Sequence, residues 1–180
     1  MFDNEYRKLK KYELIDQLAY EIRKAMHIET PINDIDQIVE YLGGTVVVDS
    51  RKHMNIGIEK TSNKTFNLYV PECRREEDHK FYVAQQLGRF FLHTNYLADD
   101  NVYYESDEFV FKNKDDYSCN YVFEENFFGG AFLMPYEEYK NQIKLNCENG
   151  IVHTDKVAEY FGVTTGTASW RGKQLGLLKD

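Results

Sequence analysis

The chain has 180 residues, of which 42% are hydrophobic and 15% aromatic, with only three prolines. This composition can build a packed core and excludes wholesale disorder. The net charge of −8 excludes the chain as a whole as an electrostatic match for nucleic acid, so a nucleic-acid contact would need a local basic patch. Apolar runs are too short to cross a membrane and the charged N-terminus lacks a signal peptide's apolar stretch, so we expect a cytoplasmic protein.

Signatures of several other chemistries are missing. The cysteines are odd in number and form no Cys-x-x-Cys pair, which argues against a disulfide framework or a cysteine-rich zinc module, so we expect free thiols. Cys119 has no evident histidine partner for thiol catalysis, and Gly43-Gly44 lacks the lysine and the spacing of a phosphate-binding loop. The Gly-x-Ser-x-Gly motif of serine hydrolases does not occur either.

The N-terminal part of the chain predicts two helices followed by a small sheet. Apolar side chains at helical spacing indicate the helices, which Thr30-Pro31 separates and Gly43-Gly44 ends. The helices are expected at residues 12–26 and 32–42. Strands, indicated by alternating or β-branched apolar residues, are expected at residues 45–49, 55–59 and 66–70. We expect these strands to form a mostly antiparallel three-stranded meander.

The stretch VAQQLGRFFLH, residues 83–93, predicts a helix with an apolar face. A polar, aromatic-rich insertion with the strand-like pieces VYYE and EFVF follows from Asn95 to about Tyr121, and a further helix runs from about Cys119 until Pro135 stops it. The aromatic residues of the insertion fit two interpretations equally well, a local core and a rim that binds another protein. These residues are Tyr96, Tyr103, Tyr104, Phe109, Phe111, Tyr117 and Tyr121.

The C-terminal part predicts a charged helix and then a compact helical pair. The charged helix is expected to end at Gly150, and the later order of helix, turn at Gly162 and second helix is that of a helix-turn-helix. In contact with DNA, the second helix would offer Thr165, Arg171 and Lys173. So few basic groups give a weak phosphate contact, and packing on the main domain or on a partner is the preferred interpretation.

Two motifs, in order along the chain, resemble those of one known family. The segment FYVAQQLGRFFLH is similar to the helix F-T-L-A-H-E-L-G-H-x-L-L-H of the ImmA/IrrE-type metallopeptidases, and EENFFGGAFLMP is similar to their second signature, E-A-N-x-F-A-x-x-L-L-M-P. The preceding helices and strands and the closing A-x-x-F-x-V and LGLL segments are similar too, so the resemblance spans nearly the whole chain.

The resemblance implies an α+β, zincin-like fold. Its parts would be N-terminal helices, the small three-stranded, mostly antiparallel sheet, a central helix in the place of the active-site helix, and a C-terminal helix-turn-helix-like pair. We expect a degenerate metallopeptidase-like domain over residues 1–140 and a C-terminal helical segment over residues 141–180.

The scaffold positions of the two motifs are retained, with some departures. The matching residues are Ala84, Leu87, Gly88, Leu92, Asn126, Phe128, Leu133, Met134 and Pro135. Glu125 stands where the family motif has alanine, and Gly129-Gly130 replace a pair that favours helix.

The resemblance places the family's chemistry on residues that cannot perform it. The two zinc histidines of the family fall on Gln85 and Arg89 and its catalytic glutamate on Gln86, while its third ligand is retained as Glu124. A glutamine amide is a poor zinc ligand and cannot act as a base, and an arginine cation repels a divalent metal. We therefore expect that zinc, the family's cofactor, is lost, and with it hydrolysis by the family mechanism.

Two hypotheses concern what replaced the metal. We predict an Arg89–Glu124 ion pair, because a carboxylate that had faced the metal needs a compensating cation, and Gln85 and Gln86 would add hydrogen bonds. His93 lies one turn beyond Arg89 on the same helix face, so a non-standard metal site of His93 and Glu124 is the alternative. Two ligands are fewer than a catalytic zinc site needs, which makes this alternative the weaker one.

Active members of the resembled family cleave helix-turn-helix repressors or promote their cleavage. With the catalytic residues lost, the resemblance implies a catalytically inactive pseudo-metallopeptidase that acts by protein binding. The expected partner is a helix-turn-helix repressor or other regulator of a phage, prophage or other mobile element. The alternatives are a zinc endopeptidase with non-standard ligands and a DNA-binding regulator that uses residues 151–178.

Overall fold

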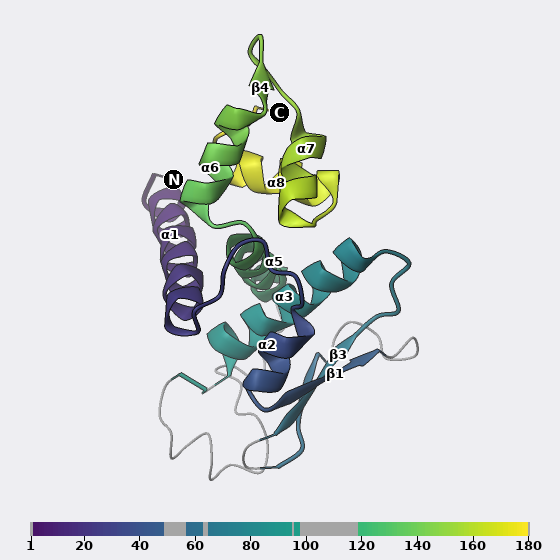
Figure 1. Cartoon of the computed structure of the whole chain (residues 1–180). Coiled ribbons are helices and arrows are strands. Elements are labelled where there is room, and N and C mark those ends of the chain that lie inside the picture. The colour runs from purple at the N-terminus through teal and green to yellow at the C-terminus, as the bar shows by residue number, and fades with distance from the viewer. Residues whose placement is uncertain (1, 49–56, 63–64, 95, 98–118, 180) are drawn as a thin grey trace. The chain divides into compact units, whose positions relative to one another are not determined.

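The computed structural model describes residues 2–48, 57–62, 65–94, 96–97 and 119–179 (Figure 1). Its mixture of helices with one three-stranded and one two-stranded sheet confirms the expected α+β fold. The chain divides into two compact units, one of Asp34–Gly129 and one of Met1–Asn33 with Gly130–Asp180. The expected boundary between residues 140 and 141 stays a prediction.

The unit of Asp34–Gly129 holds the three-stranded sheet and the helices that pack on it. Its elements are α2 (Asp36–Tyr41), β1 (Gly44–Val48), β2 (Ile58–Lys60), β3 (Phe66–Val70), α3 (Glu76–His93) and most of α5 (Cys119–Leu133). Helix α2 contacts β1 and helix α3 contacts β3, as can be followed in Figure 1. The central helix is thereby fixed against the sheet.

Strand β3 is the middle strand, in the order β1-β3-β2. Strand β1 runs parallel to it, with Val48 opposite Val70, and β2 runs antiparallel to it, with Ile58 opposite Leu68. The predicted meander is therefore wrong, because a meander would place β2 between the other two strands. Strand β3 takes the middle because it is the most apolar: Phe66, Leu68 and Val70 are buried, whereas Val48 in β1 is exposed.

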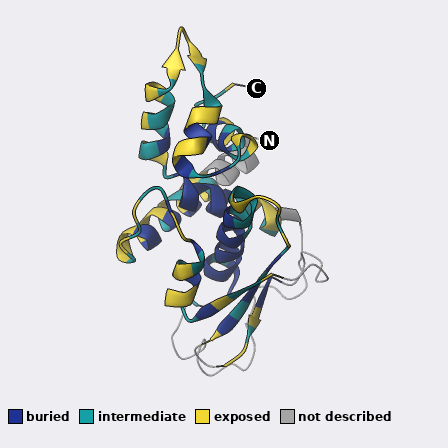
Figure 2. Ribbon diagram, turned by 45° about the vertical axis from the view of Figure 1, so that its right-hand side comes forward, coloured by how far each residue is buried: buried dark blue, intermediate teal, exposed yellow. Residues whose placement is uncertain are grey.

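Helix α3 is buried over most of its surface (Figure 2). Three acidic residues in its first turn complement the positive end of the helix dipole. The helix ends at His93, and the hydroxyl of the next residue, Thr94, donates a hydrogen bond to the carbonyl oxygen of Phe90. The helix predicted over residues 83–93 is confirmed, and it begins about two turns earlier than that stretch.

The other unit joins the N-terminal helix to the C-terminal part of the chain. Its elements are α1 (Phe2–Ala25), the last residues of α5, α6 (Tyr136–Leu145), β4 (Cys147–Glu148), β5 (Ile151–Val152), α7 (Thr154–Phe161) and α8 (Thr165–Gln174). Helix α7 packs against both α6 and α8, and Figure 1 shows these three helices in green and yellow. Within the described ranges, no helix is both long and apolar enough to cross a membrane.

A short hairpin of β4 and β5 follows α6. The charged helix expected to reach Gly150 ends earlier, at Leu145. Asn149 and Gly150 form the hairpin turn with positive φ angles of 52° and 79°, as a type I′ turn requires. The prediction is wrong here because a glycine can mark either the end of a helix or the turn of a hairpin. Only the pairing of Cys147 with Val152 shows that Gly150 lies in a hairpin turn.

The expected helix-turn-helix-like pair is formed by α7 and α8. Gly162 ends α7 in the left-handed conformation, with a φ angle of 61°. The hydroxyl of Thr164 accepts a hydrogen bond from the amide of Thr167 and so caps α8. Glycine is unfavourable inside a helix, yet a Cβ added to Gly172 would stand 2.5 Å from Cδ1 of Leu178. Close packing therefore explains this glycine.

Candidate functional site

Helices α3 and α5 approach each other closely at two glycines. A Cβ added to Gly88 of α3 would stand 3.0 Å from the carbonyl oxygen of Glu125, and one added to Gly129 of α5 would stand 3.1 Å from the amide nitrogen of Gln85. The two helices therefore run antiparallel here with their backbones in contact. A larger side chain at either glycine would push them apart, which accounts for the departure from the family motif at Gly129.

Beside this contact, Arg89 of α3 binds Glu125 of α5. Arg89 Nε donates to Glu125 Oε1 over 2.8 Å, and Arg89 Nη2 donates to Glu125 Oε2 over 3.0 Å. Two parallel N–H···O bonds are the bidentate geometry of a guanidinium–carboxylate pair. The side chains are only 4% and 1% exposed, so solvent does not screen the pair. Burial raises the pKa of Glu125, although its hydrogen bond and proximity to Arg89 oppose the shift.

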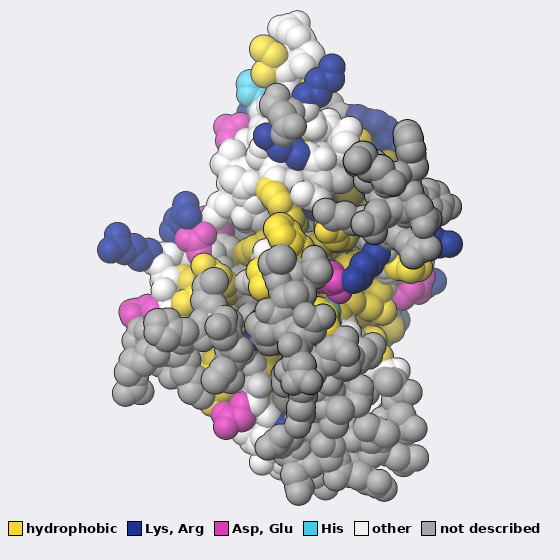
Figure 3. All heavy atoms as spheres, turned by 180° about the vertical axis from the view of Figure 1, so that it is seen from behind, with side chains coloured by type: hydrophobic (Ala, Val, Ile, Leu, Met, Phe, Trp, Pro, Cys, Tyr) yellow, Lys and Arg dark blue, Asp and Glu magenta, His cyan; other side chains and the backbone are white. Residues whose placement is uncertain are grey.

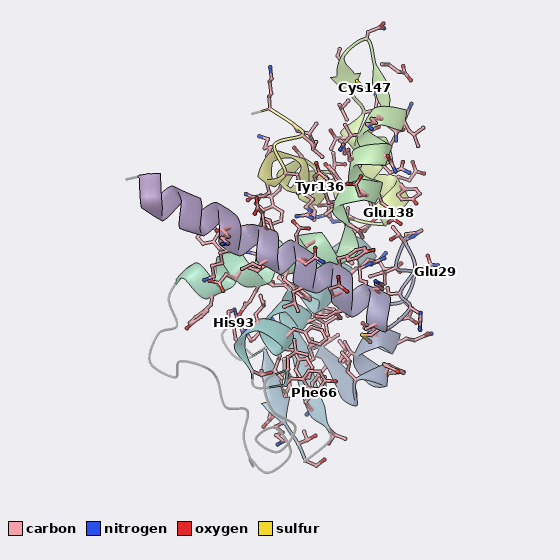
Figure 4. All side chains as sticks on the ribbon, turned by 90° about the vertical axis from the view of Figure 1, so that its left-hand side faces the viewer. Glu29, Phe66, His93, Tyr136, Glu138 and Cys147 are labelled. Atoms are coloured by element: carbon pink, nitrogen blue, oxygen red, sulfur yellow. The ribbon has the colours of Figure 1, made fainter. Side chains whose placement is uncertain are left out.

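The structure shows a carboxylate partner of Arg89 that the sequence did not predict, while the predicted Arg89–Glu124 ion pair stays a prediction. The sequence predicted Glu124, whereas the carboxylate that Arg89 binds through both oxygens belongs to Glu125, the next residue. Successive helical residues point about 100° apart, and Glu125 is the one placed against α3 at Gly88. Oε2 of Glu124 lies 3.9 Å from Nε2 of His93. His93, labelled in Figure 4, is the last residue of α3.

Gln85 and Gln86, in the places of a zinc histidine and the catalytic glutamate, are both buried. A Cβ added to Gly57 would stand 1.6 Å from Oε1 of Gln86 and 2.9 Å from Nη1 of Arg89, so the backbone of Gly57 lies directly on these two side chains. Among the described residues, Oε1 of Gln86 has no hydrogen-bond partner. The hydrogen bonds that the sequence predicted for Gln85 and Gln86 stay a prediction.

The residues at the family's metal positions do not suit zinc. Glu124 is the one good ligand among them, because Gln85 offers a weak amide oxygen and Arg89 a permanent cation already bound to Glu125. Across the described residues, no three histidine, cysteine, aspartate or glutamate side chains gather as a metal site would require. His93 and Glu124 lie near each other, but they supply only two ligands.

The predicted nucleic-acid contacts are only partly on the surface. Thr165 and Lys173 of α8 are exposed. Arg171 is fully buried, where it binds both carboxylate oxygens of Asp16 and donates from Nε to the carbonyl oxygen of Met134. The prediction of a DNA contact at Arg171 is therefore wrong, because this side chain holds the fold together. On the face seen in Figure 3, basic and acidic side chains of the described residues are interspersed without a broad basic patch.

Two aromatic residues of the insertion lie in the described part of the chain. The ring of Tyr96 packs on those of Phe90 and Phe91, with centroids 4.3 and 5.8 Å apart, and the ring of Tyr121 packs edge-on against His93 at 4.4 Å. Both contacts are those of a local core at the two ends of the insertion. The remaining aromatic residues, Tyr103, Tyr104, Phe109, Phe111 and Tyr117, lie outside the described residues, as do the strand-like pieces VYYE and EFVF.

Two residues that contact the site, Glu125 and Gly57, were not predicted from the sequence as site residues. Glu125 carried a signal, since a carboxylate there departs from the alanine of the family motif next to a retained ligand position. Gly57 carried none, because its approach to Gln86 depends on where the edge of the sheet lies against α3.

Comparisons with known proteins agree with the two motifs. The model of the IrrE N-terminal-like domain matches residues 39–171, well over half of the chain. Among solved structures, a Mycobacterium tuberculosis transcriptional regulator has a similar fold, with a TM-score of 0.57 and 19% sequence identity over 94% of this chain. The present chain covers 49% of that protein's length. No curated protein sequence matches. With its motifs, fold and family match in agreement, the chain belongs to the IrrE N-terminal-like domain family.

Proposed function

We propose that this chain is a catalytically inactive member of its family that acts by binding another protein. The observation that carries the proposal is the set of residues at the former catalytic positions. Gln85 and Gln86 supply neither a strong zinc ligand nor a base, and Arg89 is a permanent cation held by Glu125. Without a Lewis acid or a base, the family's route to an activated water is closed.

The proposed partner is a helix-turn-helix repressor or other regulator of a phage or mobile element. The support for this partner is the family resemblance, because active members act on such repressors. The protein from Mycobacterium tuberculosis with a similar fold is named a transcriptional regulator, which agrees with a regulatory role. A pseudo-peptidase would alter its partner by occupying it, without cutting it.

The first experiment measures metal and cleavage together. The full chain, purified without chelator, is analysed for zinc by mass spectrometry and mixed with the helix-turn-helix repressor encoded nearest to its gene. We expect far less than one zinc per chain, a complex detectable by calorimetry, and a repressor of unchanged mass after incubation with added zinc.

Cleavage of the repressor, or about one tightly bound zinc per chain, would overturn the inactive assignment. The variant His93→Ala then identifies the ligands, since its loss of zinc would establish the alternative site of His93 and Glu124, whose side chains lie 3.9 Å apart. An intact repressor that does not bind would overturn the choice of partner and leave the inactive assignment standing.

A further inference from the structure

We propose that the Arg89–Glu125 ion pair is a structural substitute for the metal ion, a clamp that fastens α3 to α5 and in which each residue is tolerated only because the other is present. A zinc ion held by ligands from both helices would tie them together through coordination bonds. Here the guanidinium supplies the positive charge, and the carboxylate that receives it is not a former ligand. The inference does not depend on whether the protein binds a repressor.

The first argument is that two departures from the family motif meet each other in space. Arg89 replaces a histidine on α3, and Glu125 replaces an alanine on α5. The two are 36 residues apart in sequence, yet they form both hydrogen bonds of a bidentate pair. One added cation facing one added anion is the pattern of mutual compensation.

The second argument is the position of the pair at the closest approach of the two helices. Gly88, beside Arg89, lies against the backbone at Glu125, and Gly129, one turn after Glu125, lies against the backbone at Gln85. The helices cannot separate at this point without breaking the ion pair, and the pair cannot form unless the glycines allow the approach. The clamp is therefore part of the packing of α3 on α5.

The third argument is energetic. Either charge alone, at 4% or 1% exposure, would be stranded in a medium that solvates it poorly. Arginine cannot shed its charge, whereas a glutamate can take up a proton. Replacing both members of such a pair by apolar residues of similar size often restores stability, whereas replacing one does not.

The first test is a double-mutant cycle on the full chain. The variants Arg89→Met, Glu125→Leu and the two combined are compared with wild type by thermal unfolding. We expect each single substitution to lower the melting temperature by roughly 6–20 °C and the combined variant to regain more than half of the larger loss. The matched control is the pair of Arg75, the N-cap residue of α3, and Asp78 in the first turn of the helix, which lies at the surface. For Arg75→Met, Asp78→Asn and the two combined, we expect the changes in melting temperature to add, which means no coupling between the two residues.

The cycle remains decisive where a single variant fails to fold. Recovery of soluble, cooperatively unfolding protein in the combined variant then supports mutual dependence. A combined variant no more stable than the worse single variant would overturn the proposal.

The second test asks whether the clamp stands in a metal's place, with zinc alone as the probe. The triple variant Gln85→His/Arg89→His/Glu125→Ala lacks the ion pair and has two imidazoles that, with the retained Glu124, can act as zinc ligands. We expect about one zinc per chain and a zinc-dependent rise in melting temperature, neither of which wild type or Gln85→His alone shows. A folded triple variant that takes up no zinc would contradict the substitution of a metal by the pair.

Discussion

In each of the two compact units, the described residues include a buried arginine that binds a carboxylate, and the two pairs differ in what surrounds them. Arg89 and Glu125 are 4% and 1% exposed, and they lie on the two helices that carry the motifs resembling those of the family. Arg171 is 0% exposed and Asp16 22%, and Arg171 also donates to the carbonyl oxygen of Met134, just beyond the end of α5. A buried arginine bound to a carboxylate therefore occurs in this chain both at the family's motif positions and away from them.

The difference teaches which member of a buried pair matters most when it is lost. Without Arg171, the carboxylate of Asp16 still reaches solvent, whereas without Asp16 a cation that cannot neutralise itself stays in the interior. In the Arg89–Glu125 pair both charges are shielded, so neither partner escapes to water. Removal of the acid should be the more damaging change in both units, and the asymmetry should be larger in the pair of Asp16.

The largest effect that tests this asymmetry is expected for Asp16→Ala. The substitution leaves Arg171 charged and without its carboxylate, which should lower the free energy of unfolding by about 3–5 kcal/mol. Arg171→Met should cost less, about 1–3 kcal/mol, because Asp16 is left partly solvated. Urea denaturation of both variants measures the difference. Equal losses, or a larger loss for Arg171→Met, would show that packing of the arginine side chain outweighs its charge.

A second, smaller effect concerns the packing around Arg171 on α8. A Cβ at Gly172 would stand 2.5 Å from Leu178 Cδ1, so Gly172→Ala should cost about 1–3 kcal/mol in spite of the better helix propensity of alanine. Gly166 on the same helix is the matched control, because its imagined Cβ meets nothing nearer than 3.7 Å. Gly166→Ala should be neutral or stabilise by up to about 1 kcal/mol. Thermal unfolding that gave both variants the same sign of change would contradict the packing account.

The positions of the main elements could be predicted from the sequence, and the contacts between them could not. The helical spacing of apolar residues predicted α3, and Pro135 predicted the end of α5, because both signals depend only on residues close together in the sequence. The partner of Arg89 depends on which face of α5 meets α3, and that face is set by the approach at Gly88 and Gly129. Neighbouring helical residues point about 100° apart, so the sequence alone could not show that Glu125, next to the retained ligand position Glu124, forms the bidentate pair with Arg89.

The same limit explains the predictions that were wrong. The parallel pairing of β1 with β3 joins strands that are not consecutive, so no turn between them signals it. Arg171 was expected on the surface because arginine on a short polar helix usually is exposed, and its partner Asp16 lies far away in the sequence. In each case the missing information is a contact between distant segments.

A third effect tests the burial of Glu125 through pH. Burial raises the pKa of Glu125 above its ordinary value of 4.5, so the folded chain keeps this proton to higher pH than the unfolded chain does. The stability that the protonated carboxyl contributes is fully present below the unfolded pKa and is lost as pH rises through the raised folded value. Relative to Glu125→Gln, wild type should therefore become less stable above pH 4.5, by about 1.4 kcal/mol for each unit of pKa difference.

Urea titrations between about pH 4 and 7 measure this slope. Glu137→Gln, which removes an exposed glutamate of α6, controls for the loss of one negative charge. If wild type gained stability over Glu125→Gln with rising pH, Arg89 would outweigh burial, and the pair would stabilise the fold more strongly than its surroundings suggest.

The smallest effect is expected for DNA binding by α8, because Arg171 of this helix is buried against Asp16 and holds the fold together. Neutralising Arg171 would disturb the fold, so DNA contact is tested with Lys173→Ala, which changes an exposed side chain. We expect this variant to unfold like wild type and to bind a DNA duplex no more weakly than wild type at low and moderate salt. A lost phosphate contact would instead lower the salt dependence of the binding constant by about 0.9 in the logarithmic slope. That result would give α8 a role in contacting DNA through Lys173, while Arg171 kept its structural one.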